Sequence, residues 1–238
     1  MKPIWIIAER ELSSFFDSLM AYIIIILFLG ISGFFTWIQG SDIFFVNQAS
    51  LQSFFGIAYW TLFFFIPALT MRMIAEEKKT GTIEMLLTKP IKEEEIIAGK
   101  FVATLLLIIV ALALTLGYYI TVANLGNVDH GAILLGYFGL IFMSAAYISI
   151  GILTSCLSNN QITAYLLALA IGIFFHIIFD VLSSATPGFM GHTLHYLSMS
   201  THFESVARGV IDSKDIIYFA SIIFLGLFGS KMVLSKHN

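Results

Sequence analysis

The stretch GTIEMLLTKPIKEEE, residues 81–95, lies in the most charged part of a chain that is 58% hydrophobic. The 25 residues from Glu76 to Lys100 contain 11 of the 27 charged residues in the 238-residue chain. Stretches without any Asp, Glu, Lys or Arg lie on both sides of this segment, at 43–71 and 101–128. A short charged segment between two long apolar ones is typical of a loop that connects two membrane-spanning helices.

The composition of the whole chain excludes a soluble globular protein. Its mean hydropathy is +0.93, and 11% of its residues are charged, whereas roughly a quarter are charged in a soluble domain. Charge-free runs cover 18–41, 43–71, 101–128, 131–179 and 216–230, and the polar cluster 158–161 divides the longest of them. An apolar run of about 18 residues can cross a bilayer as a helix. The sequence predicts an all-α membrane protein, a single domain of residues 1–238, with spans at about 18–38, 50–73, 98–124, 132–157, 162–182 and 215–234.

The distribution of basic residues predicts how these spans are oriented. With six spans, both termini and the loops 72–100 and 158–161 lie on one side of the membrane. Ten of the twelve basic residues fall on that side, and only Arg208 and Lys214 fall on the other. The ten are Lys2, Arg10, Arg72, Lys78, Lys79, Lys89, Lys92, Lys100, Lys231 and Lys236. The positive-inside rule therefore places both termini in the cytoplasm. The net charge of −3 and the scattered basic residues give no indication of a nucleic-acid partner.

Residues 1–16 predict an interfacial helix before the first span. An apolar stripe at helical spacing consists of Ile4, Trp5, Ala8, Leu12, Phe15 and Phe16. Such a helix lies in the headgroup plane of the bilayer, with Trp5 as its anchor.

The stretch at 81–95 predicts a second short helix. Gly81 interrupts the helical pattern, Thr82 is a suitable N-cap and Pro90 ends the run. Between them an apolar stripe consists of Ile83, Leu86 and Leu87. A helix of two turns is not stable alone in water, so we expect it to rest against a protein surface.

These residues resemble a known family. The stretch EEKKTGTIEMLLTKPI, residues 76–91, with Gly99-Lys100 after it, resembles the cytoplasmic signature of ABC-2 type transporter permeases. More narrowly, the chain resembles the gliding-motility-associated permease subunits of bacteria. Other matching stretches are 67–72, Asn160-Gln161, His202-Phe203, 208–212 and 215–218. One departure is Leu19, where members of that family often have a proline.

The resemblance implies a membrane subunit of the bacterial cytoplasmic (inner) membrane that pairs with a second permease copy or a second membrane subunit. Two copies of a separate ABC ATPase would bind ATP and Mg²⁺, and the permease itself would hold no cofactor or metal and would not be an enzyme. The sequence agrees, because it contains no GxxxxGK[ST] loop. The implied ATPase-docking residues are Gly81, Thr82, Ile83, Glu84, Leu86, Leu87, Lys89 and Pro90, and a second cytoplasmic contact is Asn159, Asn160 and Gln161. The complex would move a substrate or do mechanical work in the envelope.

His176 and Asp180 form a candidate polar path in the fifth span. Their i, i+4 spacing places them on one helix face. Ionisable residues inside a membrane are expensive and often mark an ion or substrate pathway. The alternatives are a mutually satisfied pair near the interface and a secondary transporter that uses both residues for ion coupling. An intramembrane peptidase built on Glu76-Glu77 and His176 is a further alternative, although its pattern requires an arginine where Gly81 stands.

About 30 residues between Ser183 and Lys214 connect the last two spans, which is far more than a turn requires. Their apolar spacing predicts one or two short amphipathic helices, which form an ordered outer cap. The cap residues are His202, Arg208, Gly209 and Asp212, with Gly209 ending the second helix. A copper site is the alternative interpretation, because the segment also contains His192, His195, Met190 and Met199.

Overall fold

The computed structural model of the protein describes residues 3–38, 50–87, 91–186, 188–210 and 212–235 but not the side chains of 85–87. Its described part contains helices and no strands. The helices are α1 (Pro3–Asp17), α2 (Met20–Trp37), α4 (Gln52–Thr70), α5 (Ala75–Thr80), α6 (Thr82–Leu87), α7 (Glu93–Leu114), α8 (Leu116–Leu125), α9 (His130–Leu157), α10 (Gln161–Ile173), the π-helical turn η1 (Phe174–Ile178), α11 (Phe179–Ala185), α12 (Phe189–Leu197), α13 (Met199–Ala207) and α14 (Ser213–Ser235).

Six helical segments are long and apolar enough to cross a membrane, which confirms the all-α, six-span prediction. The second extends from Gln52 to Thr80, the third joins α7 to α8, and the fifth joins α10, η1 and α11. The sequence did not predict the interruption of the third span at Thr115. The buried hydroxyl of Thr115 donates to the Leu112 carbonyl at 2.6 Å and also contacts the Tyr137 hydroxyl. Such a side-chain bond to the preceding turn competes with the helix and bends it.

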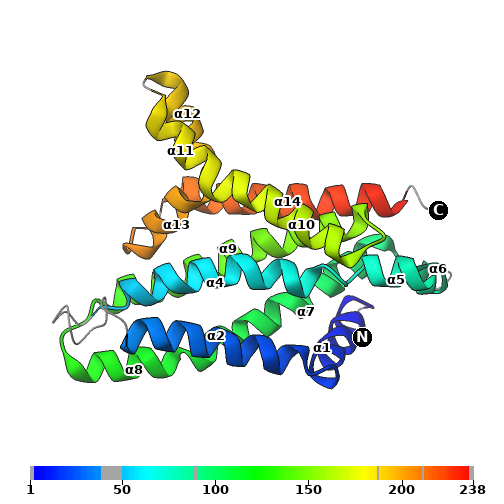
Figure 1. Ribbon diagram of the computed structural model, residues 1–238, viewed down its shortest axis with the longest axis horizontal. Helices are drawn as coiled ribbons and strands as arrows, with labels where there is room; N and C mark the ends of the chain where they lie inside the picture. Colours follow the sequence, from blue (N-terminus) through cyan, green and yellow to red (C-terminus); the bar gives the residue numbers. More distant parts are fainter. Residues whose placement is uncertain (1–2, 39–49, 88–90, 187, 211, 236–238) are drawn as a thin grey trace.

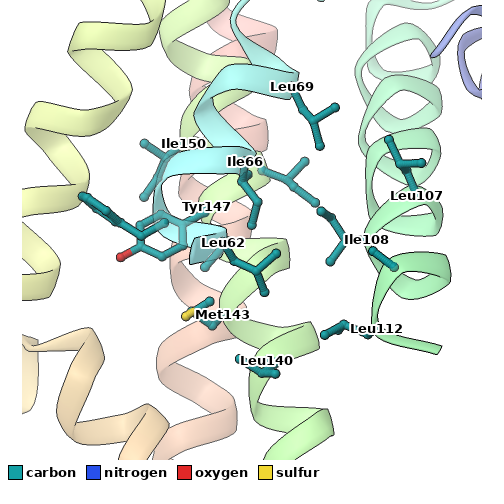
Figure 2. Close-up of a cluster of buried hydrophobic side chains, with 14 of the residues drawn as sticks. Leu62, Ile66, Leu69, Leu107, Ile108, Leu112, Leu140, Met143, Tyr147 and Ile150 are labelled. Atoms are coloured by element: carbon teal, nitrogen blue, oxygen red, sulfur yellow. The ribbon is translucent and has the colours of Figure 1, made fainter. Parts of the chain in front are cut away.

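Helix α9 lies at the centre of the bundle and contacts α4, α7, α10, α13 and α14. Of its most apolar 18-residue stretch 72% is buried, against 22% in the fifth and sixth spans. Figure 2 shows side chains of α4, α7 and α9 meeting in one buried cluster, among them Ile66, Ile108 and Met143. Lipid tails are as apolar as these side chains, so close packing rather than exclusion from water stabilises the cluster.

Small residues allow the helices of the bundle to approach closely. A Cβ atom on Gly151 of α9 would lie 2.0 Å from Oγ1 of Thr70 on α4. Likewise, a Cβ atom on Gly99 of α7 would lie 2.7 Å from the Cβ of Ile7 on α1. Any larger residue at these two positions would force the paired helices apart.

The two termini lie at the same end of the bundle, together with α1, α5 and α6 (Figure 1). The far end of α9 and the cap helix α13 lie at the opposite end, and α10 and α11 lean away from the body of the bundle toward α12 (Figure 1).

Helix α1 packs on α7 with Ile7, Ala8 and Phe15 buried. The predicted apolar stripe contained Ala8 and Phe15 but omitted Ile7. Trp5 is 52% exposed and does not take part in this packing. Its role as an anchor in the headgroup plane stays a prediction.

Candidate functional site

A fully buried lysine joins three segments at the end that carries the termini. Nζ of Lys100 on α7 donates to Oε1 of Glu77 on α5 at 2.8 Å and to Oε1 of Glu11 on α1 at 3.1 Å. It also donates to the carbonyl oxygen of Met73 at 2.8 Å. Three acceptors match the three protons of an ammonium group, so the buried ammonium is fully hydrogen-bonded. We call Glu11, Met73, Glu77 and Lys100 the Lys100 cluster.

The guanidinium of Arg10 balances the charge of the Lys100 cluster. It contacts Glu11 at 2.7 Å and Glu77 at 3.7 Å, so two cations face two carboxylates. Burial acts to raise the pKa of Glu11, but Lys100 and Arg10 outweigh it and hold that pKa below its usual value. A buried ion pair that loses one partner leaves an uncompensated charge, which costs about 3–5 kcal/mol. The cluster therefore holds α1, α5 and α7 in one arrangement.

A serine near the end of α9 fixes the turn between α4 and α5. The Ser155 hydroxyl accepts hydrogen bonds from the backbone N–H groups of Ile74 and Ala75, at 3.1 and 3.0 Å. It donates to the carbonyl oxygen of Met71 at 3.0 Å. The N–H groups at the start of a helix have no helical partner, and this buried hydroxyl satisfies two of them. The turn 71–74 is consequently tied to α9 as well as to Lys100.

Helix α6 follows directly on α5 across a left-handed glycine. Gly81 has φ of 72° and ends α5, a conformation that favours glycine. Thr82 is the first residue of α6 rather than the residue before it, and its hydroxyl donates to the Glu77 carbonyl at 3.3 Å. The predicted short helix is present and ends at Leu87.

The expected docking residues of α6 differ in exposure. Ile83 is 7% exposed and packs into the core of this chain, so its side chain is not part of the surface. Thr82 and Glu84 are exposed. Leu86 and Leu87 are helical in their backbone, whereas Lys89 and Pro90 lie outside the described residues. A polar groove of about 550 Å³ runs beside Thr82, between α1, the 71–74 turn and α5.

The second predicted contact lies at the same end. Asn160 caps α10, because its Oδ1 accepts from the N–H of Ile162 at 2.9 Å. The Ser158 hydroxyl donates to the Asn160 carbonyl and holds the turn. Asn159 and Asn160 are exposed, Gln161 is partly buried, and α10 contacts α5. The loop 158–161 therefore lies close to the α5–α6 segment.

His176 does not pair with Asp180, contrary to one interpretation of the sequence. The ring of His176 is buried, and its Nδ1 lies 2.6 Å from the hydroxyl of Tyr147 on α9. Asp180 is exposed. The two residues line one cavity of about 600 Å³ between α4, the η1–α11 segment and α13. The turn η1 that carries His176 has a π-type bond from the Phe179 N–H to the Phe174 carbonyl, and such turns are frequent at functional sites.

The predicted cap segment is helical in the structure, and His202 connects its helix α13 to α14. Nδ1 of His202 on α13 lies 2.6 Å from Oδ1 of Asp215 on α14, and Nε2 lies 2.9 Å from the Tyr196 carbonyl. Both neighbours are acceptors, and a neutral imidazole has only one N–H. The arrangement therefore requires one additional proton, either on the ring or on the Asp215 carboxyl. We call His202 and Asp215 the His202–Asp215 pair.

The other cap residues lie at the ends of α13 and α14. Gly209 has φ of 92° and follows the C-cap Arg208, as expected for a left-handed stop. Arg208 forms an exposed ion pair with Glu204 at 2.6 Å. Asp212 pairs with Lys214 at 2.9 Å, and the hydrogen bond from that lysine lowers the pKa of Asp212.

The geometry bears on two alternative interpretations of the sequence, the copper site and the peptidase. Among the described residues, no group of three or more His, Cys, Asp or Glu side chains is placed to hold a metal ion. His202, from the proposed copper segment, is bonded to Asp215 instead. The residues of the peptidase interpretation do not meet, because Glu76 and Glu77 lie on α5 whereas His176 packs beside the cap helix α13.

The sequence reasoning missed the roles of Lys100, Glu11 and Tyr147. Lys100 carried a signal, since it is the last charge before a long apolar stretch and directly follows the small residue Gly99. Glu11 and Tyr147 carried no such signal, because the role of each depends only on a partner that is far away in the chain.

The chain is similar to a known family of transporter proteins. The sequence model of a family described as ABC-2 family transporter protein matches residues 5–228. No curated protein matches the chain.

Proposed function

The chain belongs to the ABC-2 family of transporter proteins, and we propose that it converts the motion of a separate ABC ATPase into movement of its spans. Membership of this family implies a multi-pass membrane protein that associates with an ABC ATPase. The coupling to ATP hydrolysis and its route through the chain are our proposal.

The Lys100 cluster is the observation that carries the proposal. It joins α5, which is continuous with the second span, to α7 in the third span and to α1. Ser155 extends the same connection to the central helix α9. A displacement of the α5–α6 segment would therefore be transmitted to three spans, because buried ionic and hydrogen-bonded contacts resist separation.

The ATPase would dock on the surface around Gly81, Thr82 and Glu84 of the α5–α6 segment. The polar groove beside Thr82 and the nearby Asn159–Asn160 turn extend this surface. Ile83, being buried, would hold α6 in place instead of contacting the ATPase. The rest of the docking helix is assigned from the family resemblance alone and consists of Leu86, Leu87, Lys89 and Pro90.

The assembly would contain two ATPase copies, which bind ATP and Mg²⁺, and a second permease copy or a second membrane subunit. The end that carries α1, α5 and α6 would face the cytoplasm, as the basic residues predict, and the membrane would be the bacterial inner membrane. The resemblance to gliding-motility permeases supports mechanical work on an envelope component as one form of the output.

Charge reversal at Glu84 tests the docking surface. The affinity-tagged permease is purified from its native host, and the ABC ATPase that copurifies is measured by mass spectrometry. We expect Glu84→Arg to reduce ATPase recovery about tenfold or more, since reversing a charge at an interface costs about 1–3 kcal/mol. Asn124→Arg on α8 is the matched control at the opposite end of the bundle. Undiminished recovery with Glu84→Arg would refute this docking surface.

A secondary transporter is the alternative, with ion coupling through His176 and Asp180. The structure favours it less, because His176 is bonded to Tyr147 and not to Asp180. Transport by the reconstituted permease without ATPase, driven by a proton gradient and lost in Asp180→Asn, would establish that alternative.

A further inference from the structure

Two residues that line the cavity between α4, η1–α11 and α13, Tyr59 and His176, each carry a buried polar atom that lacks a partner in the described part of the chain. Tyr59 is 6% exposed and His176 is 3% exposed, and both line this cavity of about 600 Å³. Neither the Tyr59 hydroxyl nor Nε2 of His176 has a hydrogen-bond partner among the described residues. An unsatisfied buried polar group costs about 1–3 kcal/mol, so a ligand that enters the cavity deeply enough to reach these two atoms would gain hydrogen bonds from both.

The hydrogen bond to Tyr147 determines which ring nitrogen of His176 carries the proton. If the Tyr147 hydroxyl donates to Nδ1, the ring carries its proton on Nε2, and one donor is left without a partner. If Nδ1 donated instead, both the Tyr147 hydroxyl proton and the Nε2 lone pair would lack partners. The first arrangement leaves fewer groups unsatisfied. His176 therefore presents an N–H donor, which requires an acceptor atom on the ligand.

Aromatic rings form one wall of the cavity. The Tyr59 ring stacks on His176 with centroids 4.0 Å apart and on Phe203 with centroids 4.6 Å apart. Trp60 packs edge-on to His176 at 4.4 Å and also lines the cavity. A stacked aromatic wall suits an apolar or aromatic body and also attracts a cation.

The charges at the rim favour a neutral or positively charged ligand. The rim carries Asp180, Glu204 and Arg208. Arg208 is paired with Glu204 at 2.6 Å, so these two charges offset each other. The carboxylate of Asp180 remains, with no ion pair among the described residues, and it also lines an adjoining cavity of about 510 Å³ under the cap. An anionic ligand would meet this charge without a counter-ion.

We propose that this cavity binds a neutral or cationic amphipathic molecule, with an acceptor oxygen against His176 and Tyr59 and its cationic or polar end at Asp180. The apolar body lies along Tyr59, Trp60 and Phe203. The assignment rests on the proposed function in that it names a ligand class for the transporter, but the binding itself does not depend on the ATPase, because the cavity is formed by this chain alone.

Binding of a fluorescent cation to the full-length permease tests the proposal without any ATPase. Rhodamine 6G, an aromatic cation with an ester carbonyl, is titrated against the permease in lipid nanodiscs, with empty nanodiscs subtracted, and its anisotropy is measured. We expect saturable binding that Tyr59→Phe and His176→Phe each weaken about three- to tenfold, the effect of one lost hydrogen bond. Tyr22→Phe on α2, away from the cavity, is the matched control and leaves the affinity unchanged.

Several outcomes would overturn the assignment. One is an affinity that stays the same in both Tyr59→Phe and His176→Phe, and another is the absence of saturable binding. Fluorescein, a xanthene anion of similar size, is the charge control, and equal binding of fluorescein would refute the preference for a neutral or cationic ligand. ATPase recovery in the Glu84→Arg experiment is independent of all these results, so the two proposals can fail separately.

Discussion

The Lys100 cluster and the His202–Asp215 pair both tie a short helix to a span, but they use different chemistry. Lys100 offers three donors to two carboxylates and a carbonyl, and Arg10 supplies the balancing charge. The His202–Asp215 pair has two acceptors around one ring. Each site leaves one carboxylate oxygen without a hydrogen-bond partner among the described residues, Oε2 of Glu77 and Oδ2 of Asp215. The first site has balanced permanent charges, whereas the second depends on a single extra proton.

The balanced charges of the Lys100 cluster match the task that we propose for that end of the molecule. A segment that transmits force needs fixed connections, and permanently charged groups with matched donors provide them.

Loss of Lys100 should have the largest effect on stability. Lys100→Met keeps much of the side-chain volume but leaves Glu11 and Glu77 facing each other without their central cation. We expect the free energy of unfolding to fall by about 3–5 kcal/mol, measured by denaturant titration in mixed micelles. The control is Lys79→Met, an exposed lysine on α5, which should change it by less than about 0.5 kcal/mol. Equal effects of the two substitutions would contradict a fixed connection at Lys100.

Loss of the Asp215 charge should loosen the cap and leave the opposite end unchanged. Asp215→Asn removes the carboxylate that accepts from His202 or shares its proton. We expect hydrogen exchange of the α13 amides to accelerate about tenfold or more, since a buried charged hydrogen bond contributes about 1.5–3 kcal/mol. Exchange in α1 and α5 should stay the same. Asp212→Asn, which changes an exposed ion pair, is the control.

Limited proteolysis tests whether the cap is ordered. Rapid cutting throughout 190–210 in the intact protein would refute an ordered cap. Cutting that appears only after Asp215→Asn would support the anchoring role of the His202–Asp215 pair.

Acidification should produce the smallest effect, and we expect it in helix α1 at the end with the Lys100 cluster. The pKa of Glu11 is lower in the folded protein than its usual value, because Lys100 and Arg10 outweigh the effect of burial. Its stabilisation is therefore complete above the unfolded value of about 4.3 and is lost as pH falls through the folded pKa. We expect the protection of the α1 amides against hydrogen exchange, corrected for the intrinsic pH dependence of exchange, to stay constant between about pH 8 and pH 5. Below about pH 4 the protection should fall.

The matched variant for this pH experiment is Glu11→Gln. It removes the titrating carboxyl, so the loss of protection at low pH should become smaller, while the protection at neutral pH is already reduced. An identical pH profile in both proteins would show that another group controls the release of α1.

The sequence alone predicted the six spans, a helix over residues 1–16, a short helix between Thr82 and Pro90, and the helical cap with its glycine stop, and the structure has α1 at Pro3–Asp17 and α6 at Thr82–Leu87. These features depend on hydropathy over about 20 residues, on helix caps and on left-handed glycines, all of which are local properties. The family resemblance also rested on local motifs, and the match over residues 5–228 agrees with it at the level of the ABC-2 family.

Only the tertiary structure decided which polar residues meet. Lys100 bonds Glu11, which is 89 positions away, and Ser155 bonds Ile74, which is 81 positions away. The burial of Ile83 and the bond between His176 and Tyr147 likewise depend on how whole helices pack. The spacing along one helix predicted that His176 and Asp180 share a face, and both line the same cavity. It did not predict the hydrogen bond between His176 and Tyr147 on α9. A side chain's neighbours on its own helix follow from the helical repeat, whereas its partners on other helices follow from the packing of the entire bundle.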